Sequence, residues 1–315
     1  MHCLRLVTLV FIVAFVSANT RGCGKRHREG FNSNKDNHNL QSGGRTRTYA
    51  VNVPKGYNDD LDKEWPLIID FHGNGGSPEK QYENSRYYKY TQGQEYIVVY
   101  PAGVEKHWQG PSYAVKGVND LAFVTDLLEH IRDNYCIDNN RLYASGKSIG
   151  GGFVDILACS PEGNPFSAFA MAAPALYAET NPKFKCPYKR AILQAHGTKD
   201  QTIPYEGSSS GKGGPIPFIL EWVSKWGKRN GCGYQDMKTL IREGDGYKLF
   251  TYSCNGYNKI VQHYQVINNG HCWPSTSRAT TDGRRDYCGP YLFDYTPRVL
   301  EFFSRWNKQN APSNQ

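Results

Sequence analysis

Two patterns of apolar and polar residues alternate along most of the chain. Continuous apolar runs, as at 65–71 and 96–100, are typical of strands buried on both faces of a sheet. Apolar residues at helical spacing, as at 118–135, predict helices. The same patterns predict further strands over 47–53, 141–144, 168–173, 190–194 and 260–267, and further helices over 150–158, 219–226 and 299–306.

This alternation of strands and helices indicates βαβ units. The sequence therefore predicts an α/β fold with one mainly parallel central sheet and helices on both faces. We place this domain at 46–308, after a polar N-terminal arm at 19–45 and before a short C-terminal tail at 309–315. We expect the arm to be loosely held and the segment 205–216, rich in glycine and serine, to be a flexible loop.

Residues 1–18 have the order of a secretory signal peptide. The charged Arg5 precedes an apolar run over 6–16, and small residues follow up to Ala18. The run is too short to span a bilayer, and no later stretch is long and apolar enough to do so. A soluble, secreted mature protein without a membrane partner is expected.

All but one of the nine cysteines lie beyond this segment, and an even number in an exported chain favours disulfides. Their connectivity is open, although Cys232 and Cys254 flank a predicted strand pair and are expected to bond. A metal site is the weaker alternative, because the chain has no Cys-x-x-Cys pair. No metal or cofactor is expected.

The net charge of +8 is mild for a chain of 315 residues. A protein that binds nucleic acid would concentrate basic residues on one element. The dense basic patch here lies at 21–28, within the arm, where a solvated tail is the simpler interpretation. Nucleic acid is therefore not an expected partner.

The segment 146–150, Gly-Lys-Ser-Ile-Gly, matches the pattern Gly-x-Ser-x-Gly. In this pattern a nucleophilic serine occupies a sharp turn between a strand and a helix, and the glycines let that turn form. A predicted strand at 141–144 leads into the motif, and a predicted helix follows it. Ser148 is therefore the predicted nucleophile, with an incidental serine in a glycine-rich turn as the alternative.

The loop at 72–76, His-Gly-Asn-Gly-Gly, directly follows a predicted buried strand. Serine hydrolases with such a turn place an oxyanion hole there, because glycine lets backbone N–H groups approach the substrate. We expect the N–H groups of Asn74 and Ile149 to form the hole. A plain connecting loop is the alternative.

An acid and then a histidine should follow the nucleophile along the chain. Asp200 and His271 each lie just after a predicted strand, at the edge where the sites of parallel sheets gather. His196 is expected to be a hydrogen-bonding neighbour of the site, and His263 a packing or surface residue. The alternatives for the acid, in segments typical of insertions or surface, are Asp236, Asp245 and Asp294.

Four short segments carry a resemblance to a known family: Phe71-His-Gly-Asn-Gly-Gly, Gly146-Lys-Ser-x-Gly-Gly-Gly-Phe153, His196-Gly-Thr-x-Asp200 and Gly270-His-x-Trp-Pro274. Together they are similar to secreted fungal feruloyl esterases, in the group that includes polyhydroxybutyrate depolymerase-like enzymes and acetyl xylan esterases. The resemblance covers about 45–308 and implies the α/β-hydrolase fold. It also implies hydrolysis of feruloyl esters on plant cell-wall polysaccharide, chiefly arabinoxylan, by Ser148, Asp200 and His271 through an acyl-enzyme.

The resemblance implies three aromatic candidates for stacking on the phenolic ring or sugar, with ordinary burial as their alternative: Trp108, Tyr113 and Trp273. Two positions depart from the family pattern. Ile149 stands where relatives often carry a polar residue. This difference could change the acyl preference, but the backbone N–H of Ile149 can still donate to the oxyanion. Cys272 has no cysteine beside the nucleophile to pair with, so Cys288 is a candidate partner.

Two other functions stay open from the sequence. One is the same chemistry on another ester, such as an acetyl group on xylan or a polyhydroxyalkanoate. The other is a non-catalytic protein of the same fold that binds or adheres. The intact set of serine, acid and histidine argues against the second.

Overall fold

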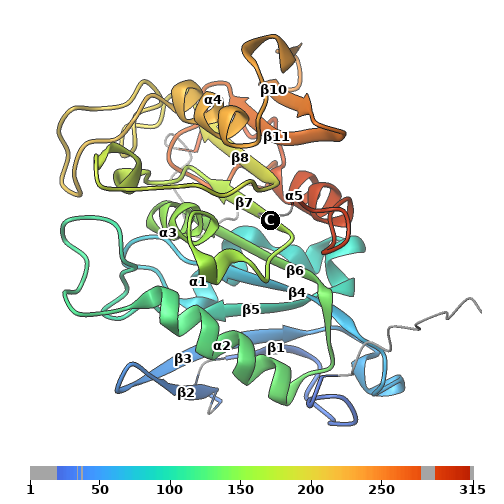
Figure 1. The fold of residues 1–315 in the computed structure, drawn as a ribbon. Helices are drawn as coiled ribbons and strands as arrows, with labels where there is room; N and C mark the ends of the chain where they lie inside the picture. The colour runs from blue at the N-terminus through green and yellow to red at the C-terminus, as the bar shows by residue number, and fades with distance from the viewer. Residues whose placement is uncertain (1–19, 34, 37, 278–287, 313–315) are drawn as a thin grey trace, which may run out of the picture.

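The computed structural model describes residues 20–33, 35, 36, 38–277 and 288–312 (Figure 1). The predicted signal peptide at 1–18 lies outside the described residues. Within the described part of the chain, no helix combines the length and the apolar character needed to cross a membrane.

The described residues form an 11-stranded sheet that runs from one end of the domain to the other. Ten of its strands follow the order β1-β3-β5-β4-β6-β7-β8-β11-β10-β9, and β2 pairs with β3. The strands are β1 (Gly30–Asn32), β2 (Asn39–Ser42), β3 (Arg45–Val53), β4 (Trp65–Phe71), β5 (Ile97–Pro101), β6 (Ile137–Lys147), β7 (Ala168–Ala172), β8 (Ile192–Gly197), β9 (Met237–Arg242), β10 (Tyr247–Cys254) and β11 (Tyr257–Val266).

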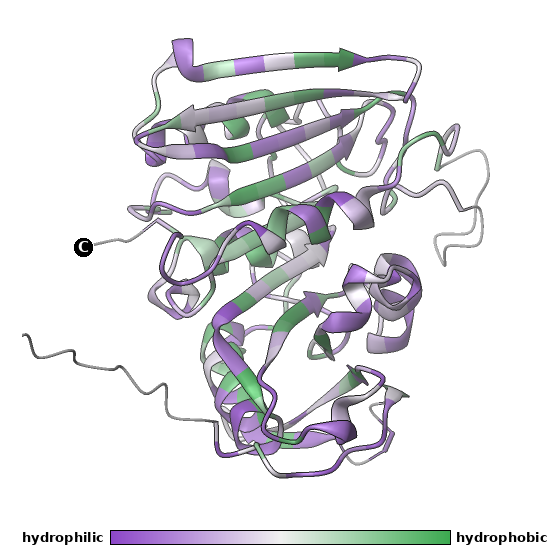
Figure 2. Ribbon diagram, turned by 90° about the vertical axis from the view of Figure 1, so that its right-hand side faces the viewer, coloured by the Kyte–Doolittle hydropathy of each residue, from purple (hydrophilic) through white to green (hydrophobic). Residues whose placement is uncertain are grey.

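The strands from β5 to β11 in this order are parallel, whereas the strands at both edges are antiparallel. Their residues explain this division. Every residue of β4, β5, β7 and β8 is buried, as expected for parallel strands covered on both faces. In Figure 2 the hydrophobic stretches lie within the strands and helices, and most connecting segments are hydrophilic.

Helices cover both faces of the sheet (Figure 1). The helices are α1 (Pro78–Ser85), α2 (Asp120–Asn134), α3 (Ile149–Ala158), α4 (Ile219–Arg229) and α5 (Tyr295–Ser304). On one face α4 packs beside α3, where the indoles of Trp222 and Trp226 donate to Asp155 at 3.2 and 3.0 Å. On the other face α5 reaches the end of α1, where the Thr296 hydroxyl donates to the Ser85 carbonyl. The predicted mainly parallel sheet with helices on both faces is confirmed.

The N-terminal arm differs from the expectation. Residues 30–32 pair with β3 as strand β1, and 39–42 pair with the start of β3 as strand β2. Cys23 is bonded to Cys136 beside β6, so the arm is tied to the body of the domain. The expectation of a loosely held arm is wrong, because backbone pairing and a disulfide hold a segment that has few apolar residues.

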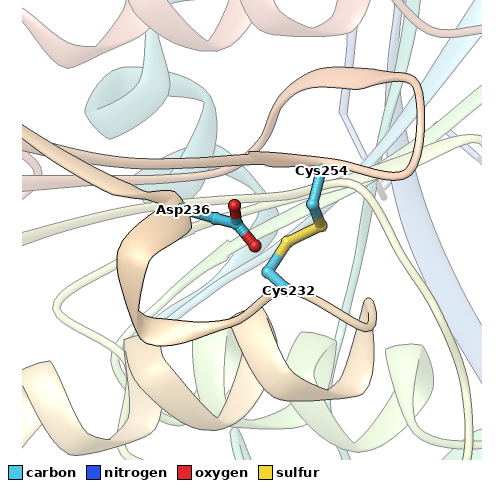
Figure 3. Close-up of side chains that lie close together, drawn as sticks. All are labelled: Cys232, Asp236 and Cys254. Carbon is cyan, nitrogen blue, oxygen red and sulfur yellow. A yellow bond between two sulfur atoms is a disulfide. The ribbon is translucent and has the colours of Figure 1, made fainter.

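Four disulfides join the eight described cysteines: Cys23–Cys136, Cys159–Cys186, Cys232–Cys254 and Cys272–Cys288. The expected bond between Cys232 and Cys254 is confirmed, and Figure 3 shows it beside the carboxylate of Asp236. The bond between Cys272 and Cys288 is also present. Among the described residues, two groups of side chains lie as close together as metal ligands do, but every cysteine in them is disulfide-bonded and offers no thiolate.

We predict that Phe153→Ala lowers the free energy of unfolding by about 3–5 kcal/mol. Phe153 on α3 is fully buried and packs on Phe71 and Trp108, with ring centroids 5.1 and 5.6 Å apart. The matched control is Leu240→Ala at a side chain that is 45% exposed, which should change stability by less than about 0.5 kcal/mol. Urea unfolding with the disulfides intact measures both, and equal effects would contradict this packing.

Candidate active site

Ser148 occupies the turn between β6 and α3. Its backbone has φ 57° and ψ −123°, a strained conformation for a residue with a side chain. A Cβ on Gly150 would lie 2.3 Å from the Phe71 carbonyl oxygen, and one on Gly146 would lie 2.7 Å from the backbone of Gly150. Glycine at both positions therefore lets α3 pack against β4 and β6 closely enough to form the turn.

The three sequence-predicted catalytic residues meet at the carboxyl edge of the parallel strands. Ser148 follows β6, Asp200 follows β8 and His271 follows β11. The Ser148 Oγ and His271 Nε2 atoms are 2.7 Å apart, and His271 Nδ1 lies 2.7 Å from Asp200 Oδ2. The backbone N–H groups of Thr202 and Ile203 donate to Asp200 Oδ1 at 2.9 and 2.8 Å.

These contacts set the charges of the site. Burial by itself raises the pKa of Asp200, but hydrogen bonds from His196 and His271 outweigh it and hold that pKa well below its usual range. Burial lowers the pKa of His271, and the attraction of Asp200 opposes this shift without cancelling it. Asp200 is therefore ionised and His271 neutral at pH 7, so that Nδ1 donates to the carboxylate and Nε2 accepts from the Ser148 hydroxyl.

The loop at 72–76 lies directly beside the serine. A Cβ on Gly73 would lie 3.9 Å from Ser148 Oγ, and Asn74 is exposed on the wall of a cavity that Ser148 and His271 also line. Ile149 is the first residue of α3, so its N–H has no acceptor within the helix. Asn74 and Ile149 thus stay our predicted oxyanion-hole donors.

His72 holds this loop in place, a role that sequence reasoning missed. Its ring donates from Nδ1 to the Gly73 carbonyl at 2.7 Å and accepts at Nε2 from the N–H of Gly103 at 3.0 Å. Its carbonyl accepts from the Trp108 indole at 2.9 Å. Burial lowers the pKa of His72 to about 4, so the ring stays neutral and keeps this donor and acceptor pattern. The position of a histidine before a glycine-rich loop was the available signal.

Two adjoining hollows open at the site and share Asn74 and Thr202 in their walls. The first, of about 320 Å³, contains Ser148 and His271. The second, of about 470 Å³, is lined by Tyr113 and other side chains. Its outer wall includes residues of the segment 205–216, where Ser208 and Ile216 form an antiparallel bridge.

Two of the three aromatic candidates do not reach these hollows. Trp108 is fully buried between Phe123 and Phe153, and Trp273 is 1% exposed and donates its indole N–H to Thr296. Neither indole has a free face for a substrate, so their proposed stacking role is corrected to core packing. Only Tyr113 of the three lines the cavity.

The alternative acids lie apart from His271. Asp294 accepts from the hydroxyls of Tyr90 and Thr276, and Asp236 caps the turn that begins at Gly233. Asp245 belongs to the turn between β9 and β10. The structure brings Asp200, and none of these three, to the histidine.

No family model matches the chain. Among curated proteins, feruloyl esterase D of Neurospora crassa is 29% identical over 279 residues, which are 84% of this chain and 83% of that protein. Feruloyl esterase B of Piromyces equi is 31% identical over 59% of this chain. A bifunctional acetylxylan esterase/xylanase of Neocallimastix patriciarum is 25% identical over 69% of this chain. The matches cover only 36% and 32% of the latter two proteins, so this chain spans about a third of their length.

Comparison with solved structures identifies the fold. An acetyl xylan esterase from Aspergillus awamori superposes with a TM-score of 0.55 and 14% identity, over 82% of this chain and 94% of the other. An S-formylglutathione hydrolase from Agrobacterium tumefaciens gives a TM-score of 0.53 and 13% identity, over 87% and 94%. This chain has the α/β-hydrolase fold. The similarity to fungal feruloyl esterases that the four segments predicted is also confirmed.

We predict that a serine-directed phosphonate labels Ser148 at a rate that falls as the pH drops through the pKa of His271. Burial places that pKa below the ordinary histidine value of about 6.5, so labelling should persist at pH 6.5 and be lost only in more acidic solution. Asp200→Asn removes the charge that raises this pKa. The backbone N–H groups of Thr202 and Ile203 hold the amide oxygen at the place of Oδ1, so an NH₂ group that cannot accept replaces Oδ2 opposite Nδ1–H. The substitution should slow labelling by up to about 10⁴-fold. It should also move to lower pH the acid limb of the profile, which is the pH range over which the labelling rate falls.

Mass spectrometry of the labelled peptide measures both effects. Asp294→Asn is the matched control, because it makes the same change in a carboxylate outside the site. An acid limb above pH 6.5, or equal effects of the two substitutions, would contradict the assignment.

Proposed function

We propose that the protein is a secreted serine esterase that hydrolyses feruloyl esters on plant cell-wall polysaccharide, with Ser148, His271 and Asp200 as its catalytic triad. One observation carries the proposal: the row of hydrogen bonds from Ser148 through His271 to Asp200 lies at the wall of an open cavity. A neutral imidazole that accepts from a serine hydroxyl is the arrangement that removes its proton during attack.

The reaction proceeds in two halves. Ser148 Oγ attacks the ester carbonyl while its proton moves to His271 Nε2, and the carbonyl electrons become the oxyanion of a tetrahedral intermediate. The intermediate collapses, the C–O bond to the sugar breaks, and His271 returns the proton to the departing alcohol. Water then attacks the acyl-enzyme with His271 as base, which releases the carboxylic acid and restores Ser148.

Two backbone donors stabilise the oxyanion. The N–H of Ile149 points from the start of α3, where the helix dipole also favours negative charge. Asn74 lies on the wall of the same cavity as Ser148. Donors of this kind act without reorganisation in a site that excludes water, and one such donor contributes about 3–4 kcal/mol.

The larger hollow supports an aromatic acyl group. Tyr113 and Tyr177 both line it, with their rings edge-on at 6.5 Å between centroids. Its volume of about 470 Å³ is in the range of ligand pockets, and its aromatic walls suit a flat phenolic ring. The sugar would then occupy the smaller, more polar hollow that contains Ser148.

The substrate class and location rest on further observations. Curated relatives are named feruloyl esterase, and the four described disulfides fit an oxidising compartment such as the extracellular space. The partner we propose is feruloylated arabinoxylan. Acetylated xylan is the second candidate substrate, because one relative is named a bifunctional acetylxylan esterase/xylanase.

We predict that Ser148→Ala lowers kcat for methyl ferulate by about 10⁶-fold, because the attacking atom is lost. Ser160→Ala is the matched control, since Ser160 is equally buried but donates to the Leu157 carbonyl away from the cavity. Release of ferulic acid measured by chromatography tests both variants. Hydrolysis by the Ser148→Ala protein at the parent rate would refute the proposed function.

We predict that Tyr113→Ala lowers kcat/KM for methyl ferulate by up to about tenfold, the effect expected from losing one aromatic contact. Its kcat/KM for a nitrophenyl acetate should change little, because an acetyl group does not reach Tyr113. Tyr234→Ala, at an 81% exposed side chain, is the control. An equal loss on both esters would place the acyl group elsewhere, and a parent protein active only on the acetate would favour the acetyl esterase.

A further inference from the structure

A row of buried polar side chains lies behind Asp200, and the triad chemistry proposed above does not use it. Gln194 and His196 point to the same face of β8, two residues apart, and His263 pairs with Gln194 from the neighbouring strand β11. Tyr205 follows in the loop after Asp200. The first three side chains belong to fully buried residues, and Tyr205 is 3% exposed.

Close polar contacts join these side chains into one path. The Tyr205 hydroxyl lies 2.7 Å from His263 Nε2, and His263 Nδ1 contacts Gln194 Oε1. Gln194 Nε2 lies 3.1 Å from His196 Nδ1. His196 Nε2 then lies 2.8 Å from the Ile203 carbonyl and 3.2 Å from Asp200 Oδ2.

The directions of the hydrogen bonds in this path follow from the Ile203 carbonyl and the Gln194 amide. The carbonyl can only accept, so His196 carries a proton on Nε2. The NH₂ group of Gln194 faces His196 Nδ1 and can only donate, so Nδ1 accepts, and Gln194 Oε1 accepts from His263 Nδ1–H. His263 Nε2 in turn accepts from the Tyr205 hydroxyl, so each bond donates toward Asp200.

Two consequences for the carboxylate follow. The His196 N–H is shared between the Ile203 carbonyl and Asp200 Oδ2, which lies 3.2 Å from Nε2, so it adds to the N–H that His271 donates. The same His196 proton holds the Ile203 carbonyl, and the N–H of Ile203 holds Asp200 Oδ1. His196 therefore helps to hold both oxygens of the Asp200 carboxylate. Burial lowers the pKa of His263 to about 3, so the His263 ring stays neutral and can both donate and accept in this path.

We propose that Gln194, His196 and His263 are positioning residues for the acyl-transfer reaction. They keep His196 in the tautomer that donates to Asp200, and thereby fix the carboxylate that orients His271. This inference rests on the proposed function, since it concerns the rate of acyl transfer by Ser148. It adds to the triad a buried second support, built from β8 and β11, that contacts the triad at Asp200.

The network also affects the pKa of His271, the base of the proposed reaction. The charged or titratable groups that act on His271 are Asp200, which raises its pKa, and Lys147 and His196, which lower it. When the His196 N–H is removed, more of the Asp200 negative charge is directed at His271. The pKa of His271 then rises, and the acid limb of kcat/KM moves to higher pH. A substitution that merely loosens the fold lowers the active fraction without moving this limb.

The decisive comparison is His196→Leu with His196→Gln, because glutamine can present an N–H near the place of the imidazole Nε2. Methyl ferulate hydrolysis is measured from pH 4 to 8, with active sites titrated by a serine-directed phosphonate. For His196→Leu we expect kcat per titrated site to fall by up to about 100-fold and KM to change far less. We also expect the acid limb of the kcat/KM profile to move to higher pH. His196→Gln should restore most of kcat and return the limb toward the parent position.

A second pair of variants tests the proposal if His196→Leu does not fold. Tyr205→Phe and Tyr143→Phe each remove one buried hydroxyl that donates over 2.7 and 2.6 Å, but only Tyr205 belongs to the network. Tyr205→Phe should lower kcat per site by about 2- to 10-fold and shift the limb in the same direction, whereas Tyr143→Phe should leave both unchanged.

The outcomes separate this inference from the proposed function. A parent protein that does not hydrolyse methyl ferulate overturns the function. An active parent overturns the positioning role if His196→Leu keeps its kcat and acid limb, if His196→Gln is no better than His196→Leu, or if the two tyrosine variants behave alike.

Discussion

The whole site depends on how closely the start of α3 packs against the ends of β4 and β6. Gly150 approaches the carbonyl of Phe71 where no Cβ fits, and this contact holds Ser148 at a positive φ. The hydroxyl then faces the edge at which β8 and β11 end, and the N–H of Ile149 lies beside it. The position of the serine is thus decided by backbone contacts, and the side chains of the site are arranged around it.

Burial has different consequences for three aspartates in this molecule. Burial raises the pKa of Asp70 to about 7 against opposing hydrogen bonds from Ser85, Ser145 and Gln81. Burial also raises the pKa of Asp155, which receives two indole N–H groups on one oxygen and has no partner on the other. Asp200 alone of the three keeps a depressed pKa, because His196 and His271 lie against its carboxylate and outweigh burial. Both oxygens of Asp70 also receive hydrogen bonds, but only from amide and hydroxyl groups, and burial prevails there.

Elements with a strong apolar pattern could be predicted from sequence, and elements held by pairing could not. The apolar runs of β4 and β5 and the helical spacing of α2 indicate their structure directly. The short strands β1 and β2 carry little apolar pattern and exist because β3 offers them partners. Likewise, Ser148 and His271 stand in recognisable motifs, whereas the connection of Gln194 on β8 to His263 on the neighbouring strand β11 leaves no mark in the local sequence.

The sequence by itself determined the α/β architecture with a mainly parallel sheet and the order of the serine, acid and histidine, because these follow from periodicity and local motifs. Its resemblance to a known family added the α/β-hydrolase fold, and the strand pair between Cys232 and Cys254 indicated their disulfide. Only the tertiary structure decided that Trp108 and Trp273 are core residues while Tyr113 lines the cavity. It also decided which aspartate meets His271. The physical reason is that burial and hydrogen-bond partnership come from contacts between segments distant in the chain, which no local pattern encodes.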